Sequence, residues 1–207
     1  MKRLLHIITL IALTAMAILA ACGSSADTET PRRGRWNGNT FTNEFFGLRF
    51  NMPNDWVATD EKEVAEMFAG ITEHFPPAGA EITPDMYQLA MEIGIFDMMA
   101  SDGDTDAFAD DNVHIVMSMV LMSAEDAHMT APEWMAHRME VLGTPHILHD
   151  GTVRIGSLDW YYMDFSPGGE VHNRLYFNEE GYFIRQINIV FRADEHLNQA
   201  LGMFRAY

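Results

Sequence analysis

One ten-residue stretch, Val113 to Met122, is apolar at almost every position. Its sequence, VHIVMSMVLM, places apolar side chains on both faces of an extended chain, because successive side chains of a strand point to opposite sides. Such a strand belongs at the centre of a sheet whose two faces are both covered. The segment therefore predicts a central strand with packed layers on either side.

The methionines of this stretch also suggest a metal site, which we weighed against core packing. Thioether sulfurs suit Cu(I), and Met117, Met119 and Met122 lie close together in the sequence. Met117 and Met119, however, share a strand face with Ile115 and Leu121. Methionine commonly fills apolar cores, so we interpret them as core residues and expect no cofactor.

The rest of the chain alternates between strand and helix patterns. Strands are expected in 39–56, with a turn at Gly47, and in 93–100. After His146, three antiparallel strands are expected, in the segments VRIGSLDWYYMDFS, VHNRLYFN and GYFIRQINIVFR. Apolar stripes with helical spacing predict helices over 60–75, 130–142 and 194–207. Asp60 with Glu63 and Thr130 with Glu133 resemble capping boxes at the starts of the first two. This order predicts an α+β fold, an α-β-α sandwich around one mainly antiparallel sheet with helices on both faces.

Three motifs carry a resemblance to a known family. The segment F-x-N-E-F-F-G-L-R-F-N-M-P-N-D-W, which ends at Trp56, resembles the opening of the Mog1/PsbP-like family. FDMMASD and NVHIVMSMV look like the middle of bacterial lipoproteins of that kind. The resemblance covers Thr40 to Tyr207 and implies the same sandwich. Known members include a Ran-binding protein and a photosystem II extrinsic subunit, so it implies a binding protein without shared catalytic residues.

The N-terminus has the features of a bacterial lipoprotein signal. Met1-Lys2-Arg3 is followed by an uncharged run that ends at the only cysteine of the chain, Cys22. Leu19-Ala20-Ala21-Cys22 matches a lipobox, in which cleavage between Ala21 and Cys22 leaves a diacylglyceryl-modified cysteine as the new N-terminus. An ordinary cleaved signal or an uncleaved membrane helix are the alternatives. Two acyl chains make a stable membrane anchor.

These features predict three regions. Residues 1–21 are the signal peptide, 22–39 form the lipidated N-terminus and a flexible linker, and 40–207 form one globular domain. The linker is polar and charged, and Trp36 is its one large apolar residue. Its arginines, Arg32, Arg33 and Arg35, are either solvated linker charges or contacts to anionic headgroups.

The charge of the chain limits its partners. The formal net charge is −17, and it becomes −19 without residues 1–21, which hold Lys2 and Arg3 but no acid. Such a charge repels nucleic acid, does not attract anionic membranes and favours a soluble monomer. We therefore expect no nucleic-acid partner.

Two clusters qualify as candidate metal sites but lack important ligands. Asp102, Asp104 and Asp106 have the spacing of the first ligands of an EF-hand calcium loop. Ala107 replaces the required glycine and Val113 replaces the bidentate glutamate, so an acidic loop between strands is the preferred interpretation.

His146 and His149, beside Asp150, form an H-x-x-H pair. On an extended segment these side chains point to opposite faces and cannot share one metal.

No catalytic motif is present, so the sequence predicts a binding protein rather than an enzyme. Its expected location is the extracytoplasmic side of a cell membrane, through the lipid on Cys22, with an extracytoplasmic protein or small ligand as partner. The alternatives are an extracytoplasmic hydrolase that uses carboxylates and an accessory protein of envelope assembly.

Overall fold

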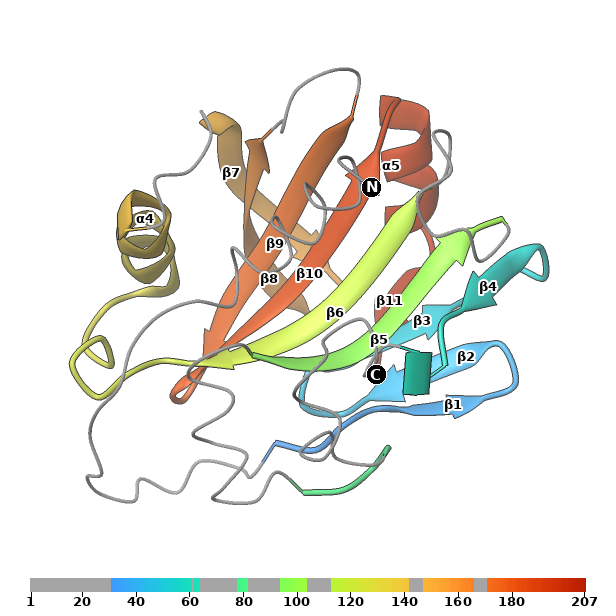
Figure 1. The fold of residues 1–207 in the computed structure, drawn as a ribbon, viewed down its shortest axis with the longest axis horizontal. Helices are drawn as coiled ribbons and strands as arrows, with labels where there is room; N and C mark the ends of the chain where they lie inside the picture. Colours follow the sequence, from blue (N-terminus) through green and yellow to red (C-terminus); the bar gives the residue numbers. More distant parts are fainter. Residues whose placement is uncertain are drawn as a thin grey trace.

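A computed structural model describes residues 31–60, 62–63, 78–81, 94–103, 113–141, 147–165 and 171–207. The signal peptide, Cys22 and most of the helix expected over 60–75 lie outside these residues. Within them, two antiparallel sheets and the helices α4 and α5 account for most of the regular structure (Figure 1). This agrees with the α+β class expected from the sequence.

The larger sheet has seven strands in the order β4-β5-β6-β10-β9-β8-β7, and every neighbouring pair is antiparallel. The strands are β4 (Trp56–Ala58), β5 (Ile95–Asp102), β6 (His114–Leu121), β10 (Phe183–Phe191), β9 (His172–Glu180), β8 (Leu158–Phe165) and β7 (Ile147–Ile155). Strand β6 lies inside this sheet between β5 and β10, and nearly all its residues are buried. The prediction of a covered central strand is confirmed.

The smaller sheet has four strands in the order β1-β2-β3-β11. They are β1 (Arg35–Asn37), β2 (Thr40–Asn43), β3 (Leu48–Asn51) and β11 (Phe204–Ala206). Its inner face and helix α5 (Asp194–Leu201) cover one face of the larger sheet. Helix α4 (Ala131–Val141) packs on the opposite face (Figure 1).

This arrangement corrects the expected sandwich. We predicted one sheet with helices on both faces, whereas a second sheet forms much of one covering layer. The strands 40–43 and 48–51 alternate between buried and outward residues. This alternation is typical of a sheet that packs face to face on another sheet. Sequence alternation fixes which residues are buried but not which sheet a strand joins.

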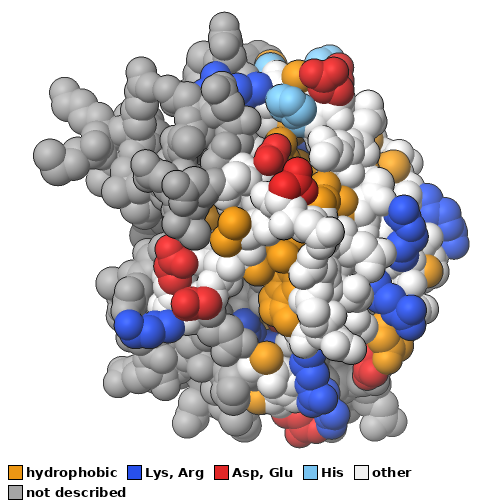
Figure 2. Space-filling view, turned by 90° about the vertical axis from the view of Figure 1, so that its right-hand side faces the viewer, with side chains coloured by type: hydrophobic (Ala, Val, Ile, Leu, Met, Phe, Trp, Pro, Cys, Tyr) orange, Lys and Arg blue, Asp and Glu red, His pale blue; other side chains and the backbone are white. Residues whose placement is uncertain are grey.

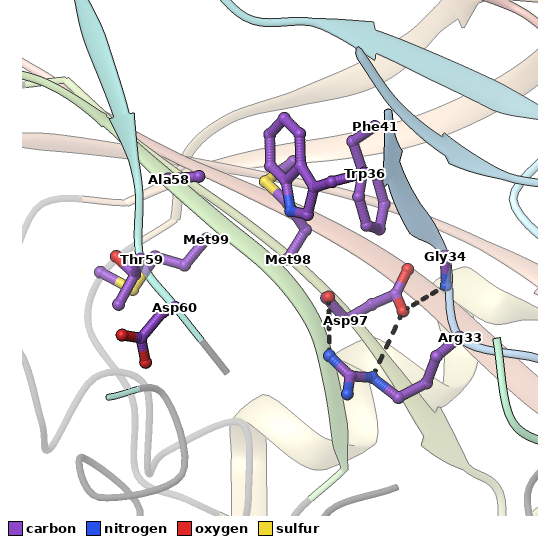
Figure 3. Close-up of a pocket in the computed structure, with 10 residues that line it drawn as sticks. All are labelled: Arg33, Gly34, Trp36, Phe41, Ala58, Thr59, Asp60, Asp97, Met98 and Met99. Atoms are coloured by element: carbon purple, nitrogen blue, oxygen red, sulfur yellow. Dashed lines mark hydrogen bonds and ion pairs between the residues drawn. The ribbon is translucent and has the colours of Figure 1, made fainter. Parts of the chain in front are cut away.

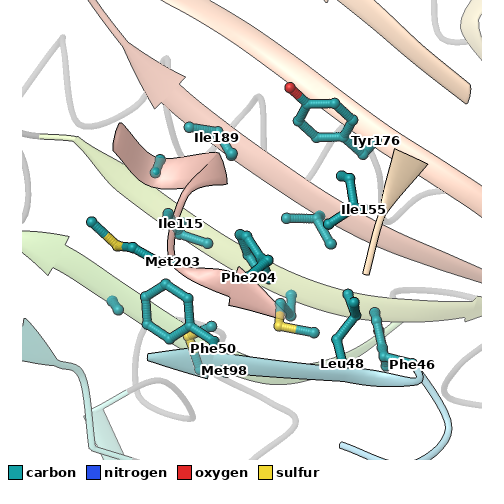
Figure 4. Close-up of a cluster of buried hydrophobic side chains, with 14 of the residues drawn as sticks. Phe46, Leu48, Phe50, Met98, Ile115, Ile155, Tyr176, Ile189, Met203 and Phe204 are labelled. Atoms are coloured by element: carbon teal, nitrogen blue, oxygen red, sulfur yellow. The ribbon is translucent and has the colours of Figure 1, made fainter. Parts of the chain in front are cut away.

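The main core lies between the two sheets (Figure 4). Phe46, Leu48, Phe50 and Phe204 project from the smaller sheet and its turn toward Ile115 and other residues of the larger one. Met117 and Met119 belong to this same core, which confirms their interpretation as packing residues. A second cluster, with Met122 in it, fills the space under α4.

Two boundaries near the C-terminal half differ from the sequence prediction. The segment predicted as one strand, VRIGSLDWYYMDFS, is a hairpin in which Gly156 and Ser157 separate β7 from β8. The expected final helix ends at Leu201, and the chain then returns as β11 to pair with β3. Phe204 is thus a strand residue of the core, although its helical spacing with Leu197 and Leu201 had suggested a longer helix.

Helix α4 begins as predicted. Thr130 donates hydrogen bonds from its backbone nitrogen and its hydroxyl to Glu133 Oε2, at 2.9 and 2.8 Å. These bonds lower the pKa of Glu133. No helix among the described residues has the length and apolar character needed to cross a bilayer.

Candidate functional site

The described residues enclose a cavity of about 310 Å³ between the N-terminal segment, the end of β4 and β5 (Figure 3). Its lining residues come from these three segments and the neighbouring β2: Arg33, Gly34, Trp36, Phe41, Ala58, Thr59, Asp60, Asp97, Met98 and Met99. The volume is at the lower end of the range for small-molecule sites. We take this cavity as the candidate site and call it the Trp36 cleft.

An ion pair between Arg33 and Asp97 forms the polar wall of the cleft. Arg33 Nε lies 3.7 Å from Asp97 Oδ1, and the exposed fractions of the two side chains are 3% and 0%. Arg33 Nη2 also donates to the backbone oxygen of Asp97 at 3.1 Å. Since a buried charge is tolerated only when it is paired and hydrogen-bonded, these contacts explain how both groups can lie inside the fold.

Both oxygens of Asp97 accept further hydrogen bonds. The backbone nitrogen of Gly34 donates to Oδ1 at 2.8 Å, and Asn43 Nδ2 donates to Oδ2 at 2.6 Å. The register of β5 against β6 shifts between Phe96 and Met98, which marks Asp97 as the extra residue of a β-bulge. Bulges redirect a side chain locally, and this one turns Asp97 toward the N-terminal segment.

Aromatic and thioether groups form the apolar walls. The rings of Trp36 and Phe41 lie 5.3 Å apart at 57°. A Cβ atom on Gly34 would be 2.2 Å from Phe41 Cζ, so only glycine allows the ring to lie against this backbone. Met98 and Met99 line the cleft from β5 (Figure 3).

Thr59 and Asp60 close the cleft beyond the end of β4. The exposed Asp60 accepts a hydrogen bond from the backbone nitrogen of Glu63 at 2.7 Å, as its predicted capping role requires. The cleft thus offers apolar walls, a hydroxyl and one exposed carboxylate, while its buried charges bind each other.

This site corrects the expected boundary between linker and domain. We predicted a flexible linker over 22–39, but within the described residues the fold begins by Arg32, which forms a β-bridge with Glu81. Arg33 is 5% exposed and Trp36 lies in strand β1, paired with Phe41. The reason is that Arg33 finds its counterion 64 positions later in the chain, which local composition cannot reveal.

Two signals in the sequence could have found this site. Trp36 is a large apolar residue in an otherwise polar segment, and Asp97 is a single acid in the apolar run IGIFDMMA. A lone charge within a buried strand implies a buried partner. Together, these two signals indicate that a basic residue close to Trp36 in the sequence packs against β5 as the partner of Asp97.

The candidate metal residues do not form a site within the described chain. Asp102 ends β5 opposite Trp56, while Asp104 and Asp106 lie outside the described residues. No group of three His, Cys, Asp or Glu side chains in the described ranges is arranged to hold a metal ion.

The histidine pair is also only partly described. His146 lies outside the described residues, and the exposed His149 has its Nδ1 atom 3.7 Å from Asp164 Oδ2. Arg174 binds the same carboxylate through two nitrogens, at 2.5 and 2.6 Å. These hydrogen bonds, which Arg174 donates to the Asp164 carboxylate, raise the pKa of Arg174. The cluster is therefore dominated by an arginine–carboxylate pair.

Comparison with known proteins gives similarity in structure only. No protein-family model matches the chain, and no curated protein does. Among solved structures, the chain is similar to cyanobacterial PsbP (CyanoP) from Synechocystis sp. PCC 6803, with 11% identity and a TM-score of 0.42 over 91% of this chain and 99% of that one.

It is also similar to a crystal structure from Bacteroides thetaiotaomicron VPI-5482, with 11% identity and a TM-score of 0.41. That match covers 82% of this chain and 48% of the other. At these TM-scores neither match carries a conclusion about family or function. At such identities the similarity concerns the fold alone.

Proposed function

We propose that this chain is a lipid-anchored extracytoplasmic binding protein whose ligand site is the Trp36 cleft. The observation that carries the proposal is that the buried charged groups of the cleft are paired with each other and its apolar groups are left to contact a ligand. Its buried charges, Arg33 and Asp97, bind each other, and its other large lining side chains are two aromatic rings and two thioethers. Sites of this composition hold the apolar body of a ligand by burial and orient it with a few polar groups.

The chemistry of the cleft favours binding over hydrolysis. A carboxylate that acts as a general base must be able to take a proton from substrate or water. Asp97 is fully buried and accepts hydrogen bonds on both oxygens. Asp60 holds the backbone of Glu63. Neither arrangement presents a pair of carboxylates to a substrate.

The exposed carboxylate of Asp60 sets the expected ligand class. A carboxylate that lines the same cleft as an indole and two thioethers favours a small cation with an apolar chain, since the indole face also attracts cations. The net charge of −17 also favours a cationic ligand. We therefore propose a small amphiphilic cation as the ligand.

Titration with three hexyl probes tests the binding site. We expect hexylammonium to change Trp36 fluorescence saturably and to bind more tightly than hexanol, and hexanoate to bind least. Asp60→Asn should weaken hexylammonium binding by about fivefold, the effect of one exposed charge. Asp159→Asn, at an exposed carboxylate of the β7–β8 hairpin, is the matched control and should have no effect. If none of the three probes binds saturably, the cleft is not the ligand site.

Metabolic labelling tests the anchor. The motif Leu19-Ala20-Ala21-Cys22 predicts that labelled fatty acid becomes attached to the protein in an expressing bacterium. The Cys22→Ser variant should carry no label and should leave the membrane fraction. Equal labelling of both proteins would show that Cys22 is not the attachment site.

A further inference from the structure

The outer face of the smaller sheet carries a row of arginines. Arg35 on β1 pairs in register with Thr42 on β2, Thr42 pairs with Arg49 on β3, and Arg49 pairs with Arg205 on β11. Residues paired across neighbouring strands lie side by side on one face. Arg35, Arg49 and Arg205 therefore cross the whole sheet with Thr42 between the first two, and we call this set the arginine row.

All three arginines are exposed, and none has a carboxylate partner among the described residues. Arg205 donates to the backbone oxygens of Gly202 and Phe204, and Arg49 lies over the ring of Tyr207. Within the described ranges, Arg35 Nη2 donates to the backbone oxygen of Gly79 at 3.4 Å. The hydroxyl of Tyr207 donates to Glu44, which marks one border of the row.

The remaining outward positions of these strands are neutral. Asn37, Thr40 and Asn51 face outward with the arginines, so the strands present no acid on this side. In the space-filling view, several Lys and Arg side chains lie along the right-hand edge of the molecule (Figure 2). A chain with 30 acidic and 13 basic residues thus keeps one face cationic.

The concentration of positive charge in the arginine row lowers the stability of the fold. Like charges directly opposite each other on neighbouring strands are destabilising, and Arg49 lies opposite Arg205. The inward residues Leu48, Phe50 and Phe204 supply the packing of these strands, while the two guanidinium groups contact only neighbouring backbone oxygens and the exposed Tyr207 ring among the described residues. The row is therefore better explained by an anionic partner than by folding.

We infer that the arginine row docks the domain on an anionic phospholipid surface. The inference rests on the proposed function, because it uses the lipid anchor at Cys22. Arg35 follows Cys22 by thirteen residues and begins the edge strand of this sheet. The fold begins by Arg32, ten residues after Cys22, and ten residues of flexible coil would span about 17 Å and reach at most about 35 Å when extended. The anchor thus keeps this sheet near the bilayer.

The chemistry of the face favours a membrane over an acidic protein. Protein interfaces depend on a buried aromatic or aliphatic centre, whereas the outward neighbours of the arginine row on its strands are Asn and Thr, and its aromatic contact is the exposed ring of Tyr207. Basic side chains near an anionic bilayer each strengthen the attraction about fivefold. Because the chain is already anchored, such weak contacts act at high effective concentration and set the orientation of the domain relative to the bilayer.

Energy transfer in vesicles tests this orientation. The lipidated chain from Cys22 to Tyr207 has no other cysteine, so Thr42→Cys places one donor dye in the row. His137→Cys places the donor on the exposed side of α4, across the larger sheet, as the reference position. The acceptor is a headgroup-labelled lipid, in vesicles of phosphatidylcholine with or without phosphatidylglycerol.

We expect phosphatidylglycerol to raise energy transfer from residue 42 relative to residue 137. The double variant R49Q/R205Q should lose this difference, and so should high salt, because screening weakens exposed charges. The variant R154Q/R192Q removes the same number of positive charges outside the row and should retain the difference in energy transfer. Equal transfer from both positions, or the same loss in both double variants, would overturn docking by the row.

A separate measurement distinguishes docking from anchoring. If the chain does not float with vesicles of either composition, the lipid anchor fails. Docking is then measured as co-sedimentation of the unlipidated chain with phosphatidylglycerol vesicles at low salt. Docking by the row is supported if the unlipidated chain binds these vesicles, R49Q/R205Q abolishes the binding and R154Q/R192Q preserves it. Absence of binding by the unlipidated chain would overturn docking by the row.

Discussion

Individual buried polar residues define the candidate site. Arg33 and Asp97 lie 64 residues apart in the chain, and their pair joins the N-terminal segment to strand β5. The bonds from Gly34 and Asn43 to Asp97 complete the set, so the carboxylate has a partner on each oxygen. Removing one member of such a buried pair is strongly destabilising because the other charge stays uncompensated. The Trp36 cleft thus depends on a few side chains that satisfy each other.

His114 gives a prediction at the same scale. Burial lowers its pKa to about 4, below the usual 6.5, because the interior disfavours the charged imidazole. The unfolded chain therefore binds the extra proton between pH 6.5 and 4, and stability falls as the pH falls through this window. We expect this residue to remove about 2 kcal/mol of stability between pH 7 and pH 5.

Urea denaturation at the two pH values measures this loss. The His114→Gln variant cannot take up the proton, so its loss between pH 7 and pH 5 should be smaller than that of the parent by the same amount. An identical loss in both proteins would show that another group causes the acid sensitivity.

Among the elements, short turns decide how the two sheets meet. Gly156, in the turn between β7 and β8, adopts a φ of 63°, in the left-handed region that favours glycine. A Cβ atom there would lie 2.5 Å from Leu48 Cδ2 and 3.2 Å from the Cα atom of Ala206. The hairpin of the larger sheet therefore contacts the backbone of the smaller one at a position where no side chain fits.

Two glycine substitutions separate strain from crowding. Gly38 has a φ of 57°, but a Cβ atom there would meet nothing within 4 Å. We expect Gly38→Ala to cost about 1 kcal/mol of unfolding free energy for the backbone alone. Gly156→Ala should cost about 1–3 kcal/mol more, because Leu48 and the strand at Ala206 must move. Chemical denaturation compares them, and equal losses would refute the close contact between the sheets.

For the whole molecule, strand order predicts where the fold opens first. Strands β6 and β10 lie inside the larger sheet, and β7 is an edge strand whose first four residues, Ile147–Asp150, are exposed. Amides of a covered central strand exchange only through large-scale opening, whereas edge residues exchange by local opening. Native-state hydrogen exchange should therefore find the slowest amides in β6 and β10. If β6 exchanges as fast as the start of β7, the central position of β6 in solution is wrong.

The sequence by itself determined the local structure that follows from periodicity and capping. The both-face apolar pattern of Val113–Met122 predicted a buried inner strand, and Thr130 with Glu133 predicted the start of α4, because both signals act between residues close in the chain. The turn at Gly47, with its φ of 64°, is of the same kind. The lipobox at Cys22 remains a sequence prediction outside the described residues.

Only the tertiary structure decided which distant segments meet. It placed β1, β2, β3 and β11 in a second sheet, because pairing between chain ends depends on hydrogen bonds that alternation does not specify. It made Arg33 a buried partner of Asp97, although local composition had assigned Arg33 to a solvated linker. It also aligned Arg35, Arg49 and Arg205, which lie far apart in sequence, because cross-strand register brings them onto one face.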